Sequence, residues 1–247
     1  MKKRRLFSLF LSFALLLPLF SLTSADAYED FDLDAKAGLL IEADTGEILY
    51  EKNAHQENFP ASLTKVMVAL LVFEAIDEGK IALTDSVTAT ESAFEGLSSD
   101  GSTANIVPGE TMTVEQLLNC MLIVSANEAC NILGETLYGS VDAFVARMNE
   151  RAAELGCEHT HFANATGLHN SQHYTTAWDL YLITREALKH DKFMEICNSK
   201  SYTVPATNMT DKPRELHSTN FLISNWRARG YVYRDAQGIK TGSTPEA

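Results

Sequence analysis

The sequence has little cysteine and little positive charge for its length. Its 247 residues include only four cysteines, and 20 lysines and arginines stand against 33 aspartates and glutamates, which gives a formal net charge of −13. A chain this acidic is not expected to bind nucleic acid or anionic lipid through bulk electrostatics. It also shows no internal repeat and no low-complexity tract.

The sequence also lacks the cysteine spacing of a zinc site. No CxxC occurs, and Cys120 and Cys130 lie in apolar helical surroundings, where a cysteine is expected to be a small buried hydrophobe. Four cysteines allow three disulfide pairings, which stay open. A cysteine and four histidines do cluster along the chain, but we predict no metal site from them, because two of the histidines flank Thr160 in an expected strand or loop. This cluster comprises Cys157, His159, His161, His169 and His173.

The apolar run near the N-terminus is too short to predict a membrane span. Leu6–Phe20 covers 15 residues, against the ~20 that cross a bilayer. The run follows the basic residues Lys2–Arg5 and precedes the small-residue site Ala25-Asp26-Ala27, a pattern typical of a cleaved export signal. We therefore predict a signal peptide over residues 1–27, with a retained membrane anchor as the alternative. The remaining residues 28–247 are expected to form one domain around one sizeable core.

Strands are predicted near both ends of this domain and helices between them. Residues 37–52 predict a hairpin around the turn Asp44-Thr45-Gly46, and the tail from Tyr231 to Gly242 has strand character. Residues 83–108 are polar and predict a loop-rich excursion. Helices are expected at about 62–77, after a capping box of Thr113 and Gln116, at 127–138, at 141–155 and after Thr176. The pattern predicts an α/β fold in which an antiparallel sheet packs with a helical lobe.

Three short motifs in a fixed order supply the parts that acyl transfer through a serine ester requires. They are Ser62-Leu63-Thr64-Lys65, Ser125-Ala126-Asn127 and Lys240-Thr241-Gly242. In the first motif, Ser62 and Lys65 are three residues apart at a helix start, so their side chains share one face. The helix N-terminus and burial both disfavour an ammonium, which favours a neutral Lys65 that takes the Ser62 proton. The backbone N–H of Ser62 is a candidate donor to a developing oxyanion.

The other two motifs supply a proton relay and an anion site. Ser125 and Asn127 fall between two predicted helices, where a hydroxyl relays a proton and an amide bonds a substrate carbonyl. Lys240 and Thr241 place an ammonium beside a hydroxyl, which suits a carboxylate, and Gly242 lets a substrate backbone approach closely. Each motif alone has an ordinary structural explanation, and the ordered set is what points to chemistry.

These motifs and several longer segments resemble the D-alanyl-D-alanine carboxypeptidases, low-molecular-mass penicillin-binding proteins of peptidase family S11. The similarity runs from about Ala37 to Thr244. The segments that carry it, besides the three motifs, are Pro60-Ala61 before Ser62, Asp44-Thr45-Gly46, Glu154-Leu155-Gly156, Thr160-His161-Phe162, Asn164-Ala165-Thr166-Gly167-Leu168, and Ser218-Thr219-Asn220 with Leu222.

The resemblance implies a penicillin-binding, β-lactamase-like transpeptidase fold and a serine-type carboxypeptidase that removes the terminal D-Ala from peptidoglycan stem peptides. It implies attack by Ser62 with Lys65 as base, an oxyanion hole from the N–H groups of Ser62 and Ser243, and proton relay by Ser125. The departing carboxylate would lie on Lys240 and Thr241. β-Lactams are expected to acylate Ser62 as covalent inhibitors. No metal or organic cofactor is implied, and the expected location is extracytoplasmic, at the cell wall or the outer face of the cytoplasmic membrane.

Two departures from the family pattern are visible. Ala126 stands where the family usually has glycine. The sequence also ends at Ala247, whereas in the family two further strands and a helix follow the Lys-Thr-Gly segment. The resemblance therefore predicts a C-terminally incomplete fold, and it places membrane association in a C-terminal region that this sequence does not contain.

Two other functions share these motifs. A serine β-lactamase needs a glutamate that activates the deacylating water. Glu115-Gln116-Leu117-Leu118-Asn119 matches its E-x-x-L-N pattern, but it precedes Ser125, whereas the β-lactamase motif follows that position. A non-catalytic module that binds penicillin or wall peptides would keep the fold without releasing D-Ala.

Overall fold

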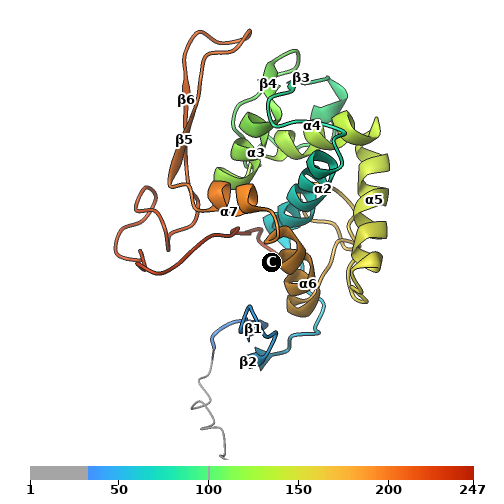
Figure 1. The fold of residues 1–247 in the computed structure, drawn as a ribbon, viewed down its shortest axis with the longest axis vertical. Coiled ribbons are helices and arrows are strands. Elements are labelled where there is room, and N and C mark those ends of the chain that lie inside the picture. The colour runs from blue at the N-terminus through green and yellow to red at the C-terminus, as the bar shows by residue number, and fades with distance from the viewer. Residues whose placement is uncertain (1–32, 100) are drawn as a thin grey trace, which may run out of the picture.

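The computed structural model describes residues 33–99 and 101–247. The predicted signal peptide, and its boundary with the domain, lie outside the described residues. Element labels follow Figure 1. The chain forms, in order, β1 (Gly38–Ile41), β2 (Ile48–Lys52), a 3₁₀ turn (Ala61–Thr64), α2 (Lys65–Asp77), β3 (Ser86–Thr88), a 3₁₀ turn (Ser92–Phe94), β4 (Thr111–Thr113), α3 (Val114–Ile123), α4 (Asn127–Tyr138), α5 (Val141–Glu154), α6 (Ala177–Ala187), α7 (Asp191–Cys197), β5 (Ser201–Val204) and β6 (Arg214–His217).

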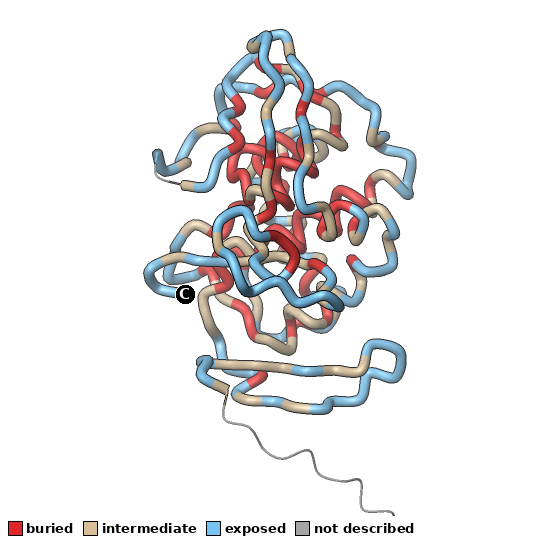
Figure 2. Tube along the Cα trace, turned by 90° about the vertical axis from the view of Figure 1, so that its left-hand side faces the viewer, coloured by how far each residue is buried: buried red, intermediate tan, exposed pale blue. Residues whose placement is uncertain are grey.

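Helix α2 is the centre of the molecule, and the other helices surround it (Figure 1). Its sequence is apolar on every side from Val66 to Phe73, and ten of its thirteen residues are buried. A helix that is apolar all round must be covered by other elements. Helices α3, α4, α5 and α6 all pack against it. Figure 2 shows the same result as a buried interior within the helical body, whereas the β1–β2 hairpin is intermediate or exposed.

Local sequence signals set the helix starts as predicted. Thr113 and Gln116 form the expected capping box at α3, with the Thr113 side chain accepting from the Gln116 backbone and the Gln116 side chain accepting in return. The Ser140 and Thr176 side chains cap α5 and α6 with a single bond each, accepting from the backbone N–H of Ala143 and of Asp179. The predicted helices over 62–77, 127–138 and 141–155 are confirmed within a few residues at their ends.

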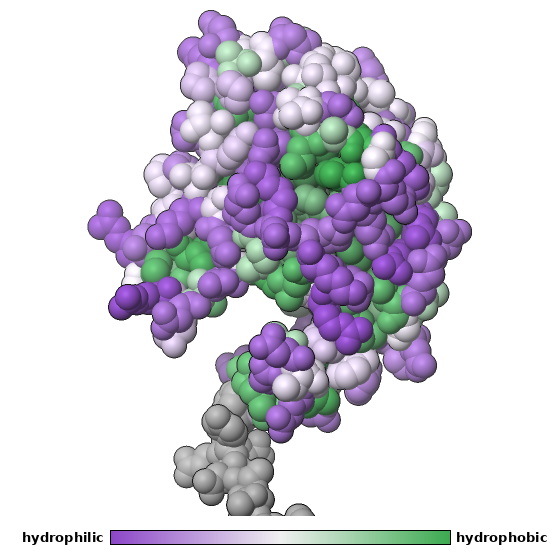
Figure 3. All heavy atoms as spheres, viewed as in Figure 1, coloured by the Kyte–Doolittle hydropathy of each residue, from purple (hydrophilic) through white to green (hydrophobic). Residues whose placement is uncertain are grey.

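The strands form three separate two-stranded antiparallel sheets among the described residues: β1–β2, β3–β4 and β5–β6. The α/β class with a helical lobe is confirmed, and the predicted hairpin over 37–52 is β1–β2, which pairs Gly38 with Lys52. The sequence patterns did not reveal β3–β4, β5–β6 or the short helix α7. On the face in Figure 3, apolar side chains gather on the β1–β2 hairpin, where Leu40, Ile48 and Leu49 are exposed.

The prediction of a strand within residues 231–242 is wrong, because this stretch belongs to no strand. A strand requires a neighbour that satisfies its backbone groups. Here side chains do so instead: Asn198 Oδ1 accepts from the backbone N–H of Gly238 at 2.6 Å, and Asn220 Nδ2 donates to its carbonyl oxygen. Among the residues that the structure describes, no helix has the length and apolar character of a membrane span.

Candidate active site

Ser62 lies in the tight turn that precedes α2. The turn follows Pro60, whose carbonyl accepts from the backbone N–H of Leu63 at 3.1 Å, and Ala61 takes a left-handed backbone with φ +48°. Side chains with a Cβ rarely adopt this conformation. Ser62 itself is half-buried. We call the turn Ala61–Thr64 the nucleophile turn.

Lys65 is fully buried, and its amine bonds three acceptors from three parts of the chain. Its Nζ lies 2.9 Å from Ser62 Oγ, 2.9 Å from Asn127 Oδ1 and 2.6 Å from the Thr166 carbonyl oxygen. Two of its protons are used by the amide oxygen of Asn127 and the carbonyl oxygen of Thr166, because these two atoms can only accept. The third position faces Ser62 and holds a proton when the lysine is charged and a lone pair when it is neutral.

Burial shifts this balance toward the neutral amine. The loss of hydration lowers the pKa of Lys65, and the nearby Cys130 and Glu128 oppose that shift. A lysine with a lowered pKa is able to take a proton from a hydroxyl at neutral pH. The geometry and the electrostatics therefore make Lys65 a candidate general base for Ser62.

The second motif, Ser125-Ala126-Asn127, lies at the start of α4 and contacts Lys65 through Asn127. The Asn127 amide oxygen accepts from Lys65, which leaves its Nδ2 for another partner, and its backbone N–H donates to the Ser102 carbonyl at 2.9 Å. Ser125 is buried in a left-handed backbone with φ +67°. Its Oγ has no hydrogen-bond partner among the described residues. A buried hydroxyl without a partner is costly, so this atom is suited to meet an incoming group.

The third motif reaches the nucleophile turn through Gly242. A Cβ at Gly242 would lie 2.8 Å from the Pro60 carbonyl oxygen, so only glycine allows this approach. Thr241 Oγ1 lies 2.7 Å from Thr219 Oγ1. Lys240 donates to the Thr241 carbonyl at 2.7 Å, and burial, followed by repulsion from Lys65, lowers its pKa to about 7. Ser243 is exposed.

The segment Asn164–Leu168 also packs against the nucleophile turn. Asn164 Oδ1 accepts from the backbone N–H groups of Thr166 at 3.1 Å and Gly167 at 2.8 Å, which turns the Thr166 carbonyl toward Lys65. Gly167 has φ +85°, and a Cβ there would lie 1.9 Å from the Ala61 carbonyl oxygen. No sequence pattern predicts a main-chain carbonyl beside Lys65, because this contact joins residues far apart in the chain.

The hydrogen bonds and ion pairs of Glu128 and Glu115 are made with residues outside the three motifs. The buried Glu128 accepts from Thr103 Oγ1 at 2.7 Å and from the Ala104 N–H at 2.8 Å, which ties the loop before β4 to α4. Glu115 lies in the first turn of α3 and pairs with Lys192 of α7 at 2.6 Å. The E-x-x-L-N match is therefore part of a structural ion pair, as expected from its position before Ser125.

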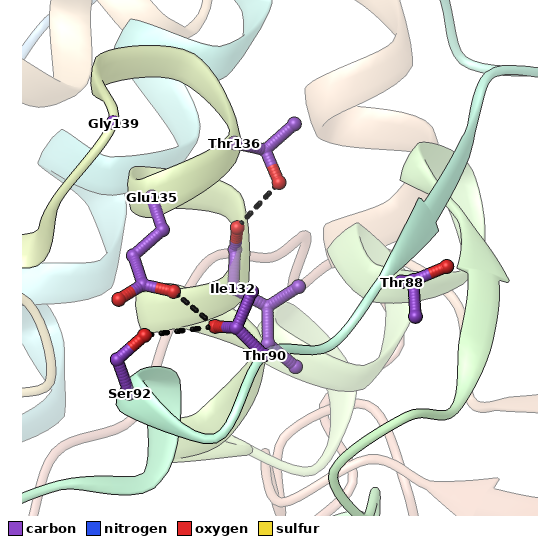
Figure 4. A pocket seen from close by; sticks show the side chains of 7 residues that line it. All are labelled: Thr88, Thr90, Ser92, Ile132, Glu135, Thr136 and Gly139. Carbon is purple, nitrogen blue, oxygen red and sulfur yellow. Dashed lines mark hydrogen bonds between the residues drawn. The ribbon is translucent and has the colours of Figure 1, made fainter.

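One cavity lies beside the nucleophile turn, and another lies far from it. A cavity of about 330 Å³ borders the nucleophile turn at Pro60 and Leu63. Another, of about 180 Å³, lies at the C-terminal end of α4, opposite Asn127 (Figure 4). There the Thr90 hydroxyl lies between Glu135 and Ser92, so the polar side chains satisfy one another. All four cysteines are buried and unpaired, and no group of three metal-binding side chains occurs in the described ranges.

Comparisons with known proteins identify the family to which the chain is similar. A sequence model of the D-alanyl-D-alanine carboxypeptidase family matches residues 23–247. D-alanyl-D-alanine carboxypeptidase DacF of Bacillus subtilis is 40% identical over 214 residues, which are 87% of this chain and 52% of that protein. DacC of Escherichia coli is 32% identical over 220 residues, with 87% and 52% covered.

A solved structure agrees with these relatives. The DD-transpeptidase of a Streptomyces strain superposes with a TM-score of 0.78 and 30% identity, over 89% of this chain and 84% of that one. The chain spans about half the length of the curated relatives it matches. These similarities concern the fold and the family, and they cover the three motifs of the candidate site.

Proposed function

Because the chain belongs to the D-alanyl-D-alanine carboxypeptidase family of serine peptidases, we propose that it removes the terminal D-Ala from peptidoglycan stem pentapeptides. The reaction would pass through an acyl-enzyme on Ser62. The observation that carries this proposal is the buried Lys65 amine, which lies 2.9 Å from Ser62 Oγ and has a lowered pKa. A serine is a weak nucleophile until a base of this kind adjoins it.

In the first half-reaction, Ser62 Oγ attacks the carbonyl carbon of the D-Ala–D-Ala bond while its proton passes to Lys65. The negative charge that forms on the carbonyl oxygen would be met by the backbone N–H groups of Ser62 and Ser243. The free Nδ2 of Asn127 would donate to a carbonyl of the stem peptide. These donors belong to the protein before substrate arrives, so little reorganisation is needed at the transition state.

Ser125 would deliver the proton that releases D-Ala. The amine of the departing residue needs one proton as the C–N bond breaks, and Ser125 would relay it from Lys65. Support for this role comes from the Ser125 Oγ, which is buried and has no hydrogen-bond partner among the described residues. Lys240 and Thr241 would hold the carboxylate of the same D-Ala. Water then attacks the ester and gives a proton to Lys65. Lys65 passes this proton to Ser62 Oγ as the ester C–O bond breaks and the shortened peptide leaves with a new carboxylate.

The same steps make β-lactams covalent inhibitors. Their strained amide would acylate Ser62, but the leaving nitrogen stays tethered and blocks the water. We further propose that residues 1–27 direct export, which would bring the protein to its substrate outside the cytoplasmic membrane. Support for export comes from the basic, apolar and small-residue pattern of this segment.

Release of D-Ala from a diacetylated L-Lys-D-Ala-D-Ala tripeptide tests the proposal directly. We expect release by the purified protein, none by Ser62→Ala, and unchanged release by Ser92→Ala. Ser92 is a matched control, since it is an exposed serine beside the remote cavity. A folded protein that binds the peptide without releasing D-Ala would instead be the non-catalytic module.

The rate of penicillin turnover distinguishes the proposed carboxypeptidase from a serine β-lactamase. The carboxypeptidase is expected to form a long-lived penicilloyl adduct, whereas a β-lactamase releases penicilloic acid many times. Rapid multiple turnover of a penicillin, with no D-Ala release, would overturn the proposal in favour of a β-lactamase.

A further inference from the structure

His173 is a buried titratable side chain that the proposed chemistry does not use. It is 2% exposed and lies in the segment between Asn164–Leu168 and α6. The next residue, Tyr174, forms an antiparallel bridge with His161, which anchors the segment. The Phe162 ring packs edge-on against the His173 ring, with centroids 5.6 Å apart.

A chain of three hydrogen bonds joins His173 to the nucleophile turn. The backbone N–H of Ala163 donates to His173 Nδ1 at 3.1 Å. Nε2 of the same ring lies 2.7 Å from Thr64 Oγ1, and the Thr64 hydroxyl donates to the Ala61 carbonyl oxygen at 2.8 Å. The chain therefore begins at a main-chain donor and ends at a main-chain acceptor.

The two ends fix the direction of every link. An amide N–H only donates, so Nδ1 must accept and the single ring proton must be on Nε2. The Ala61 carbonyl only accepts, so the Thr64 hydroxyl points its hydrogen there and receives the Nε2–H on its lone pair. His173 is thus neutral, in the Nε2–H tautomer, and no other protonation state satisfies all three bonds.

The atom at the end of this chain controls the direction of a proposed catalytic donor. The Ala61 carbonyl and the Ser62 N–H belong to one planar peptide unit and point in opposite directions. Fixing the carbonyl therefore fixes the N–H. The unit also needs fixing, because Ala61 has an unfavourable φ of +48°. Gly167 packs against the same carbonyl oxygen from the other side.

We propose that His173 is a positioning residue that aims the Ser62 N–H at the reacting carbonyl oxygen, acting through Thr64 and the Ala61–Ser62 peptide plane. The proposal rests on the proposed function, since it gives that N–H the role of oxyanion donor. His173 touches neither Ser62 nor the site where substrate would bind.

The surroundings of His173 maintain the required neutral state. Burial, with Coulombic repulsion from His161 and Lys65, lowers the pKa of His173 to about 4. A second ring proton, on Nδ1, would face the Ala163 N–H and break the first link. The positioning chain is therefore complete at neutral pH and is expected to fail only in acid.

Paired variants test the chain by separating acylation from stability. His173→Phe keeps the ring and removes both nitrogens, and Thr64→Val keeps the shape and removes the hydroxyl. We expect each to slow acylation of folded protein by a fluorescent penicillin about 10- to 100-fold, less than the 10²–10³ of deleting an oxyanion donor, with unchanged initial binding. The double variant should be no slower than the slower single, because both break one chain.

Two further variants control for simple structural damage. Thr64→Ser restores the hydroxyl and should recover most of the rate. Thr175→Val removes an equally buried hydroxyl of the same segment, whose 2.8 Å bond goes to Thr160 instead. It should lower the melting temperature without slowing acylation of folded molecules. Additive losses for His173→Phe and Thr64→Val, or no slowing of acylation, would overturn the positioning role.

A measurement without activity keeps this proposal distinct from the proposed function. In ¹⁵N NMR, the His173 ring should show a protonated Nε2 and an unprotonated Nδ1 from pH 8 down to about 5. The Ser62 amide resonance should move in both His173→Phe and Thr64→Val, and remain in place in Thr175→Val. An unmoved Ser62 amide would refute the positioning chain, whereas a moved amide on a protein that penicillin never acylates would refute the function alone.

Discussion

Two lysines belong to the candidate site, the buried Lys65 and the half-buried Lys240, and they are held in opposite ways. Lys65 begins a helix that is covered on all sides, and its amine bonds three acceptors from separate segments. Lys240 lies in a stretch that belongs to no strand, and its amine donates a hydrogen bond to the adjacent Thr241 carbonyl. Figure 2 shows the first region within the buried interior.

The difference indicates a division of labour between the two regions. The region proposed to transfer protons, built on α2 and α4, is fixed by packing and by non-local hydrogen bonds. The region proposed to bind the carboxylate, residues 238–242, is attached mainly through side chains such as Asn198, Asn220 and Thr219. Changes in the first region should therefore abolish chemistry, whereas changes in the second should weaken binding by graded amounts.

The largest effect is expected when the first lysine loses its amine. Lys65→Met keeps a linear side chain of similar length but removes the base, so acylation by a fluorescent penicillin should fall by about 10³- to 10⁴-fold, the upper range for a positioned base. Lys240→Met, the matched change in the second region, should leave a measurable acylation rate. Stopped-flow labelling of both variants tests the contrast, and equal losses would contradict it.

Two glycines on either side of the nucleophile turn provide the next test. Gly167→Ala places a Cβ against the Ala61 carbonyl within a left-handed backbone. We expect a loss of about 1–3 kcal/mol in the free energy of unfolding and about 10²-fold slower acylation. Gly242→Ala meets Pro60 at 2.8 Å, but its segment is not paired in a sheet and is expected to shift, so acylation should slow about tenfold.

Gly79→Ala separates backbone strain from contact in this comparison. Gly79 also has a positive φ, of +71°, but a Cβ there meets nothing within 4 Å. It should lower the melting temperature without slowing acylation. If Gly242→Ala proved as damaging as Gly167→Ala, the second region would be as rigid as the first.

The pH dependence of binding distinguishes the two lysines more finely. The pKa of Lys240 is about 7, so its charged fraction falls above neutrality, and a substrate carboxylate loses its partner. KM for a carboxylate-bearing peptide should rise about tenfold per pH unit above 7. The rise should stop at the pH where the free energy of binding the carboxylate is just enough to keep Lys240 protonated in the complex. Lys240→Arg stays charged and should flatten the profile. A flat profile for the unmodified protein would exclude Lys240 as the carboxylate site.

The same lysine should appear in the pH dependence of stability, with a defined sign. Its pKa is about 7 when folded and about 10.5 when unfolded, so the unfolded chain binds more protons between these values. Its contribution to the free energy of unfolding must therefore rise with pH across that window. Denaturant titrations at pH 7 and pH 10 should show less of this rise in Lys240→Met.

The smallest effect is expected at the side chains that hold the second region. Asn198→Ala removes the acceptor for the Gly238 N–H, a bond worth about 0.5–1.5 kcal/mol. KM should rise a few-fold with little change in the acylation rate constant. Asn208→Ala removes two comparable bonds, to Thr111 and Gly109, in a remote loop, and should leave KM unchanged. A rise in KM for Asn208→Ala, without a rise for Asn198→Ala, would contradict the proposal that residues 238–242 bind the substrate carboxylate.

The sequence predicts the helical region better than the segment 231–242. Helix starts depend on neighbouring residues, and Thr113, Ser140 and Thr176 marked them correctly. The 231–242 segment was predicted as a strand from its local composition, but pairing is non-local, and the bonds of Gly238 go to Asn198 and Asn220 instead. Helix α7 is not predicted from the sequence, because it has only seven residues and no side-chain cap.

The candidate site shows the limit of motif reading. The three motifs contained Ser62, Lys65, Asn127 and Lys240, and the structure gathers these segments around the nucleophile turn. The Thr166 carbonyl and His173 were not predicted as parts of it, since a main-chain acceptor has no sequence signature and a buried histidine resembles a ligand candidate.

The most direct test of the central claim, that Lys65 activates Ser62, is the site of penicillin attachment. The purified protein is labelled with a penicillin, digested and mapped by mass spectrometry, with Ser62→Ala and Lys65→Met treated in parallel. We predict one penicilloyl group, on Ser62, absent from Ser62→Ala and nearly absent from Lys65→Met. A label on another residue, or full labelling of Ser62 in Lys65→Met at the unmodified rate, would contradict the account.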